Sequence, residues 1–423
     1  MGQYFVDITL GNGRFKMCIS LGPSAPRNHR FYYPGAFVTV TYRYTLQLIV
    51  HIGHCLRRVF CLALLLVYTS QSLADSKPSI TFINPDYPGA SFWGSVTQLM
   101  QLVAEDLGIE LEVLYSNGNR FHNISHIKSI VSRDHKPDYV IFMYSGVEGL
   151  KILKQTERAK IFSISFNSDI PLEYRDKVGL PGENFNYWLA HLVPDDENAG
   201  YTLGKFLLEY VPKDDTQISI GALSGGYSSF MANLRLQGLQ RALDESTSRK
   251  DQLRQAIPAS WDGQDTQAKV AGLISRYNDI NVIWGGNAKI AIEAEKALST
   301  QQINGYKSVR VVGFDWTSEM INAISNRQVI ATMGGHFIDG AIALILAYDH
   351  FHGIPMALSK KKINTRLSLL SMNNVDAMRK IIDPEHWEEK DFRQLSKFHN
   401  PNIPTKTLDT EIFRKFLLST NPH

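Results

Sequence analysis

Four of the six tryptophans in this chain fall at the ends of stretches that read as β-strands. They are Trp93, Trp261, Trp284 and Trp316. Flat aromatic rings pack well against the C–H-rich faces of sugar rings, so aromatic side chains gathered at strand ends favour a sugar-like ligand. A single tryptophan at such a place is more often part of a hydrophobic core, and the inference therefore depends on the joint placement.

Polar side chains accompany these rings. Asn167, Asn287 and Asp315 follow strands and offer donors and acceptors for ring hydroxyls. Arg235 adds a fork of donors from a following helix. Simpler roles stay open, because Asp315 could cap the next helix, Asn167 could form an Asx turn and Arg235 could make a surface salt bridge. The candidate ligand-binding residues are Phe92, Trp93, Tyr144, Asn167, Arg235, Trp261, Trp284, Asn287, Asp315 and His336.

The sequence offers little catalytic chemistry. It contains no H-E-x-x-H, G-x-S-x-G or G-x-x-x-x-G-K-[ST] motif, and the glycine pair after Ser224 lacks the lysine of a phosphate-binding loop. His122 and His126 have no nearby third ligand, which favours a solvated helix face over a metal site. We therefore predict a protein that is not an enzyme and uses no cofactor and no metal. An enzyme with Asp315 or His336 as acid or base is the alternative.

The elements that must position these residues alternate between strand and helix. The predicted strands are 79–83, 111–115, 138–144, 161–166, 218–223, 281–284 and 309–313. The predicted helices are 92–107, 123–132, 147–156, 197–210, 230–243, 266–277, 290–298 and 318–325. Nearly continuous apolar runs such as DYVIFMY indicate strands buried on both faces, as in a parallel sheet. These strands and helices are too many for a single sheet of ordinary size, so we predict an α/β fold with two doubly wound, Rossmann-like lobes.

Composition and charge suit a secreted globular protein. The chain has 423 residues, 44% of them hydrophobic, and a formal charge of +3. Residues 1–74 carry +6 and the rest −3, so the basic bias belongs to the front segment and gives no reason to expect nucleic acid as a partner. All three cysteines precede Ala74, which leaves the remainder without thiols and suits an oxidising compartment.

The stretch LRRVFCLALLLVYTSQSLADS has the form of a secretion signal. Two arginines precede an apolar run that is too short to span a membrane, and small residues lead to a cleavage site near Ala74. We predict a signal peptide at 56–74, export to the periplasm, and a non-native or disordered extension at 1–55. A buried core helix is the alternative for the apolar run.

Between about 79 and 352 the sequence resembles the type I periplasmic binding proteins, both the ribose/galactose sugar binders and the autoinducer-2 receptor branch. The matching stretches are SFW at 91–93, VPDDENAGYTLGKFL, ANLRLQGLQRAL, ASWDGQ, VIWGGNAKIAIEA and VVGFDWTSEMINAI. The chain departs from the sugar binders at Asn167 and Ala288, where they usually have aspartate. Asn167 is more like the autoinducer-2 branch.

The resemblance implies a monomeric protein that closes two lobes on a small polyhydroxylated ligand, a monosaccharide or an autoinducer-2-like molecule. Phe92, Trp93 and Trp261 would stack on it. The partner would be an inner-membrane ABC permease or sensor kinase, and a ligand-independent interaction protein is the alternative. We expect lobe crossings near 193–196, 332–336 and 363–366. The expected domains are a first lobe of 75–194 plus 336–362, a second lobe of 195–335, and a tail of 363–423 packed over both.

Overall fold

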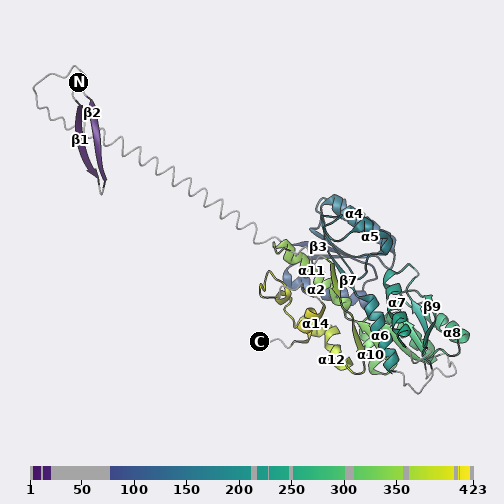
Figure 1. Ribbon diagram of the computed structural model, residues 1–423. Coiled ribbons are helices and arrows are strands. Elements are labelled where there is room, and N and C mark those ends of the chain that lie inside the picture. Colours follow the sequence, from purple (N-terminus) through teal and green to yellow (C-terminus); the bar gives the residue numbers. More distant parts are fainter. Residues whose placement is uncertain are drawn as a thin grey trace, which may run out of the picture. The chain divides into compact units, whose positions relative to one another are not determined.

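The computed structural model describes residues 3–10, 13–20, 77–210, 217–226, 228–246, 251–300, 309–355, 362–403, 408 and 410–419. The chain divides into two compact units, Met1–Ser76 and Lys77–His423 (Figure 1). In the first unit, β1 (Gln3–Leu10) pairs antiparallel with β2 (Gly13–Ser20). The prediction from the sequence included no regular element there. It missed the alternation of Tyr4, Val6, Ile8 and Leu10 with mostly polar neighbours, a period-2 pattern that is typical of a strand. The predicted signal peptide lies outside the described residues.

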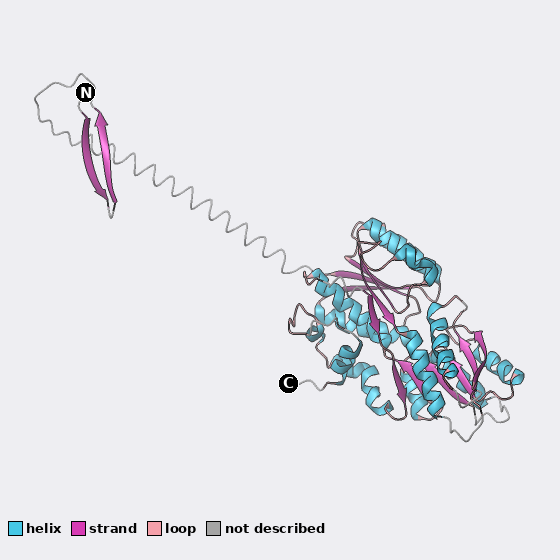
Figure 2. Cartoon of the chain, in the orientation of Figure 1, coloured by secondary structure: helices cyan, strands magenta, loops and turns pink. Residues whose placement is uncertain are grey.

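The second unit contains two mainly parallel sheets covered by helices on both faces (Figure 2), so the predicted fold class is confirmed. The sheet of the first lobe has the order β13-β7-β6-β5-β3-β4. Its strands are β3 (Ser79–Asn84), β4 (Glu110–Tyr115), β5 (Tyr139–Met143), β6 (Phe162–Phe166), β7 (Trp188–Pro194) and β13 (Lys362–Thr365). Its helices are α2 (Ser91–Leu107), α3 (Arg120–Val131), α4 (Gly146–Ala159), α5 (Leu172–Val178) and α11 (Asp339–Phe351).

Alternation along each strand explains how one sheet packs two helical layers. In β5, Ile141 belongs to the apolar cluster of α2 and α11, whereas its neighbours Val140 and Phe142 belong to the cluster of α3 and α4. Successive side chains of a strand point to opposite faces, so a strand between two layers must be apolar throughout. This is why DYVIFMY reads as an unbroken apolar run.

The second lobe repeats the strand order of the first, as β14-β12-β11-β10-β8-β9. Its strands are β8 (Ser219–Ser224), β9 (Gln252–Pro258), β10 (Val282–Gly285), β11 (Arg310–Phe314), β12 (Ala331–Gly334) and β14 (Ser368–Ser371). Its helices are α6 (Asp196–Tyr210), α7 (Phe230–Asp244), α8 (Thr266–Arg276), α9 (Ala288–Thr300) and α10 (Ser318–Ser325). Only β14 runs in the opposite direction, since it pairs antiparallel with β12. The strand ends of the two lobes can therefore be compared position by position.

The chain crosses between the lobes where the sequence placed the crossings. The first joins Pro194, the end of β7, to Asp196, the start of α6. The second follows Gly334, where β12 gives way to the short helix η2 (His336–Ile338) and then α11. The third runs from Thr365 in β13 to Ser368 in β14. The backbone N–H of Asp195 donates to the carbonyl of Thr365 at 2.9 Å, which ties the first crossing to the third.

Residues 375–403, 408 and 410–419, here called the C-terminal strap, pack on both lobes. Its helices are α12 (Val375–Arg379), η4 (Lys380–Ile382), α13 (Pro384–Glu388), η5 (Phe392–Leu395) and α14 (Thr410–Leu418). Arg379 binds the side chain of Asn322 in α10 of the second lobe, at 3.1 Å. Asp106 in α2 of the first lobe accepts from the N–H of Phe392 at 2.7 Å. The strap thus fastens the two lobes to each other on their outer side.

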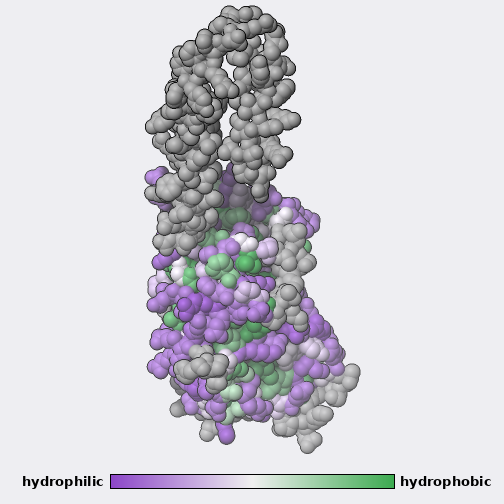
Figure 3. All heavy atoms as spheres, turned by 90° about the vertical axis from the view of Figure 1, so that its left-hand side faces the viewer, coloured by the Kyte–Doolittle hydropathy of each residue, from purple (hydrophilic) through white to green (hydrophobic). Residues whose placement is uncertain are grey.

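The prediction from the sequence also missed β7, although WLAHLVP is a mainly apolar run buried along its whole length. Several other elements that it did not include have weak or misleading patterns. In β9, an outer strand of intermediate burial, polar and apolar residues are mixed without strict alternation, and β12, β13 and β14 have four residues each. Helix α11 is buried nearly all round, so it shows no amphipathic period. Among the described residues, no helix is both long and apolar enough to cross a membrane. The face drawn in Figure 3 is mainly polar, with apolar side chains in small areas between polar ones.

Candidate ligand-binding site

A cleft of about 420 Å³ lies at the carboxyl ends of the strands, with walls from both lobes. Clefts of this volume are typical of small-molecule sites. Eight of the ten candidate residues line it. They are Phe92, Trp93, Asn167, Arg235, Trp261, Asn287, Asp315 and His336. The structure therefore brings together residues that are up to 244 positions apart in the chain, from Phe92 to His336.

The first lobe contributes an aromatic wall at the start of α2. Phe92 and Trp93 meet edge to face, with ring centroids 5.3 Å apart. Trp93 is held from behind by Phe166 at 5.8 Å, and Phe92 lies 4.7 Å from the ring of His336. Interlocking rings of this kind cannot turn independently, so the wall presents a fixed apolar surface to the cleft.

The second lobe contributes Trp261, which is 36% exposed and lies across Gly225. A β-carbon at Gly225 would overlap the indole ring, so only glycine allows the ring to lie there. The backbone carbonyl of Trp261 accepts a hydrogen bond from the side-chain amide of Asn287 at 2.8 Å. The side-chain oxygen of Asn287 accepts a hydrogen bond from the N–H of Ile290 and so caps α9. Asn287 therefore orients Trp261 as well as lining the cleft.

Asn167 and Asp315 occupy equivalent positions in the two lobes, directly after β6 and β11. Both have left-handed backbone conformations, with φ of 68° and 72°, and asparagine and aspartate tolerate this region better than other non-glycine residues. Asn167 is 4% exposed, and its side-chain oxygen has no hydrogen-bond partner among the described residues. A buried unpaired acceptor is costly, so this oxygen is suited to a ligand hydroxyl.

Asp315 accepts a hydrogen bond from the N–H of Ala288 at 3.3 Å, at the start of α9. Burial raises the pKa of Asp315, and the charge of Arg235 offsets part of this effect. His336 lies 3.5 Å from the carboxylate, longer than a hydrogen bond. Burial lowers the pKa of His336 well below its usual range, and the Arg235 charge lowers it further, so the ring is neutral at physiological pH.

Arg235 is the central cation of the site and is 3% exposed. Its Nε donates to Asp196 at 2.8 Å, and its Nη1 donates to the carbonyl of Gly286 at 2.8 Å. Its guanidinium carbon lies 4.2 Å from the centre of the Phe314 ring. Burial raises the pKa of Asp196 to about 6, although the charge and the hydrogen bond of Arg235 act against this rise. Arg235 is therefore a buried ion-pair partner, and the surface salt bridge considered for it is excluded.

The close packing of α6 against α7 places Arg235 in this position. A β-carbon at Gly200 would overlap the carbonyl of Arg235, and one at Gly238 would overlap the carbonyl of Glu197. Glycine at both points lets the two helices approach until Asp196, at the start of α6, reaches the guanidinium. The segments DENAGYTLGKFL, which begins at Asp196, and ANLRLQGLQRAL thus supply both the contact surface and the ion pair.

A family model of the periplasmic binding protein domain matches residues 80–350. The chain belongs to the periplasmic binding protein family. Curated relatives include the ribose import binding protein of Escherichia coli K12, 22% identical over 242 residues, which are 57% of this chain and 74% of the relative. The corresponding Haemophilus influenzae protein is 22% identical over 273 residues, 63% of this chain and 82% of the relative.

Solved structures with this fold include a periplasmic sugar-binding protein from Pseudomonas fluorescens. It is 25% identical, with a TM-score of 0.70 over 81% of this chain and 99% of that one. The arabinose-binding component of an ABC transporter from Shewanella sp. ANA-3, bound to α- and β-L-arabinofuranose, has a TM-score of 0.62 at 16% identity, over 74% of this chain and 98% of that one. The second likeness is one of fold alone.

Two candidate residues of this periplasmic binding protein lie away from the cleft. Tyr144 is fully buried beside Gly149 in the core of the first lobe. It follows Met143, which lines the cleft, and successive residues of a strand point to opposite faces. Trp284 lies within β10 and packs on Phe314 at 5.3 Å, in the core of the second lobe. The expectation that both face the ligand is not met, and each is a core residue.

Sequence reasoning also missed part of the lining. The additional residues are Pro85, Asp86, Tyr87, Ser91, Asn117, Gly118, Arg120, Asn123, Met143, Ser145, Met231, Ser260, Asp262, Ala288 and Lys289. Asn117 and Arg120 follow β4, so the rule that ligands meet strand ends would have found them if it had been applied to the predicted strand at 111–115. Met231 lies on α7 and carries no signal of this kind.

Proposed function

We propose that this protein captures a small, uncharged, polyhydroxylated molecule such as a monosaccharide by closing its lobes over the cleft. It then delivers the ligand to an ABC permease of the inner membrane. The observation that carries the proposal is the pairing, in one cleft, of aromatic walls from both lobes with the unpaired side-chain oxygen of Asn167. Aromatic rings suit the C–H faces of a sugar, and the oxygen suits a hydroxyl donor.

The charges of the cleft support an uncharged ligand. Arg235 is already paired with Asp196, and the neutral ring of His336 adds no positive charge. A buried anion on the ligand would need a cation in the inner part of the cleft that is not already paired with a carboxylate. Asp315, with one oxygen on the α9 N-terminus, remains able to accept from a hydroxyl.

The relatives support the proposal that the bound ligand is passed on to a transporter. A similar fold occurs in an ABC transporter periplasmic solute binding protein from Actinobacillus succinogenes with bound D-allose, which has a TM-score of 0.61 at 18% identity over 71% of this chain and 99% of that one. An interaction protein that needs no ligand would be favoured by a cleft filled with its own side chains. Trp284 and Trp316, the two side chains considered for that role, are each 1% exposed in the lobe cores and do not line the cleft.

Tryptophan fluorescence and thermal melting of the full chain against pentoses, hexoses, polyols and autoinducer-2 test the proposal. Trp93 and Trp261 line the cleft, so a ligand should shift the emission spectrum in a saturable way. A ligand at about a hundredfold excess over its Kd should stabilise the native state by about 2.7 kcal/mol.

Variants separate the cleft from the rest of the molecule. We expect Trp261→Ala and Asp315→Asn each to weaken binding at least about tenfold, which is about 1.4 kcal/mol. The control is Leu180→Ala, an exposed apolar residue that is not part of the cleft lining. If no panel member gives a saturable response, or if the control weakens binding as much as the cleft variants, sugar capture at this site is wrong.

A further inference from the structure

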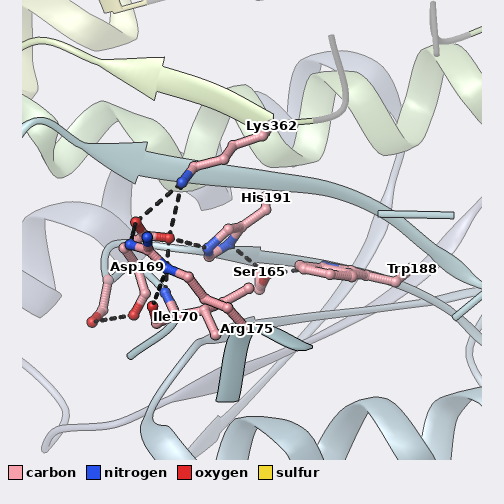
Figure 4. A network of polar contacts seen from close by, with 8 residues as sticks. Ser165, Asp169, Ile170, Arg175, Trp188, His191 and Lys362 are labelled. Carbon is pink, nitrogen blue, oxygen red and sulfur yellow. Dashed lines mark hydrogen bonds and ion pairs between the residues drawn. The ribbon is translucent and has the colours of Figure 1, made fainter. Parts of the chain in front are cut away.

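A charged cluster in the first lobe is centred on the loop that follows β6 (Figure 4). Its centre is Asp169, which is 8% exposed. Lys362 donates to both carboxylate oxygens at 3.1 and 3.0 Å, and Arg175 donates to one of them at 3.3 Å. The N–H of Ile170 donates at 2.8 Å, and the ring of His191 lies 3.5 Å away. None of these residues lines the ligand cleft.

The carboxylate of Asp169 keeps its charge in spite of burial. Burial raises its pKa, but His191, the charge of Lys362 and the N–H of Ile170 together hold the pKa well below its ordinary value. The cost of removing a charge from water is offset here by several donors around one carboxylate. The loop is therefore fixed at Asp169 by contacts to three other elements, α5, β7 and β13.

Two of these elements run directly into the lobe crossings. His191 lies on β7, which ends at Pro194 before the first crossing. Lys362 begins β13, which ends at Thr365 before the third crossing. The hydrogen bond from Asp195 to Thr365 joins these crossings just beyond the cluster. A movement of either strand must therefore move a partner of the Asp169 carboxylate.

The same cluster fixes the backbone on both sides of Asn167. Before it, the hydroxyl of Ser165 is paired with Nδ1 of His191 at 2.8 Å and accepts from the indole N–H of Trp188 at 3.0 Å. After it, Asp169 is held as described above. Asn167 itself has φ of 68° and a buried, unpaired side-chain oxygen in the cleft. Its position depends on anchors two residues away in each direction.

The cluster also reaches the second lobe. The guanidinium carbon of Arg175 lies 5.9 Å from the centre of the Phe230 ring. Phe230 is the first residue of α7, the helix that carries Arg235 into the cleft. Arg175 thus contacts both Asp169 in the first lobe and Phe230, at the start of α7, in the second lobe.

We propose that Asp169 is a positioning residue that couples the ligand-binding loop at Asn167 to the first and third lobe crossings. Its carboxylate holds loop and crossings in one arrangement, so that the geometry of Asn167 suits a ligand only when the lobes are correctly placed. A ligand shifts the lobes only as far as it binds one arrangement more tightly than another. Asp169 would create this difference in affinity by making the position of Asn167 depend on the arrangement of the lobes. The affinity part of this proposal rests on the proposed ligand binding, whereas the coupling to the crossings does not.

Hydrogen exchange measured by mass spectrometry on the ligand-free full chain tests the coupling. Asp169→Asn keeps the size of the side chain and removes its charge. We expect amide exchange in the segments around Asp195 and 362–368 to become at least about fivefold faster than in the wild type. The matched control is Glu112→Gln, which removes a carboxylate paired with Arg133 at 2.7 Å in the same lobe, away from the crossings.

Ligand titration then separates this proposal from the proposed function. With a ligand from the panel, Asp169→Asn should weaken binding about tenfold, Glu112→Gln should leave it unchanged, and Asp169→Glu should restore part of the loss. If the wild type binds no ligand but exchange rises only in Asp169→Asn, the proposed function fails and the coupling stands. If the two carboxylate variants change exchange and affinity alike, Asp169 is merely structural and the proposal is overturned. Lys362→Met gives the same test from the other partner if Asp169→Asn does not fold.

Discussion

Replacing Arg235 by methionine keeps much of the side-chain length and removes the cation that lies 2.8 Å from Asp196. Both side chains are buried, and removing one partner of such a pair costs about 3–5 kcal/mol, because the other charge stays buried without compensation. The carbonyl of Gly286 also loses its donor, and a buried acceptor left unpaired costs about 1–3 kcal/mol. We expect the free energy of unfolding at pH 8 to fall by about 4 kcal/mol or more.

The loss should depend on pH, because burial raises the pKa of Asp196 to about 6. At pH 5 this carboxyl is mostly protonated in the folded state, and a neutral group needs the cation much less. Without Arg235 the pKa of Asp196 rises further, and the difference between pH 8 and pH 5 amounts to about 1.4 kcal/mol for each unit of that further rise. Arg235→Met should therefore be clearly less harmful at pH 5.

Urea denaturation without ligand at both pH values measures this effect. In the background of Arg235→Met, the second change Asp196→Asn should recover most of the lost stability at pH 8, because it removes the uncompensated charge. Ligand affinity should not return, since Arg235 lines the cleft. A loss of equal size at pH 5 and pH 8, or no recovery in the double variant, would refute the assignment of this pair as a buried ion pair.

Three further changes test other parts of the structure. Burial raises the pKa of Asp339 to about 8, so the wild type loses stability as the pH rises from about 4 through 8 and this carboxyl ionises. An asparagine side chain cannot ionise, so the melting temperature of Asp339→Asn minus that of the wild type should be higher at pH 8 than at pH 5. Calorimetry at both pH values measures this difference. Gly225→Ala should displace the ring of Trp261 and weaken ligand binding by about tenfold, about 1.4 kcal/mol, in a titration, with little change in melting temperature. Gly238→Ala should force α6 and α7 apart at Glu197 and cost about 1–3 kcal/mol in urea denaturation.

The fold was predictable because its strongest signals are local. Runs such as DYVIFMY and IFSISF are buried on both faces, and the helices between them are amphipathic, so each element can be recognised without its neighbours. Helix α11 and the strands that end at Gly334 and Thr365 gain their stability from long-range packing and pairing instead. Such elements leave little trace in their own sequence.

The site was predictable wherever a residue follows a strand and faces the cleft. Asn167 and Asp315 were found because the carboxyl ends of parallel strands meet at one edge of each sheet. Tyr144 and Trp284 show the limit of that rule, since a shift of one position along a strand turns a side chain to the opposite face. The pairing of Arg235 with Asp196 needed the close approach of two helices, which no spacing in the sequence reveals.

The order in which the strands occur along the chain bears on how this protein folds. β13 and β14 complete the two sheets, yet they come after every other strand, and the strap follows them. Until they pair, β7 and β12 are outer strands whose backbone groups invite pairing with other chains. Contacts between segments this far apart form slowly, because a long loop must close before they add stability. Completion of both sheets is thus a late event in folding, and a chain that stops before Lys362 would leave β7 and β12 as outer strands, each without its pairing partner on one side.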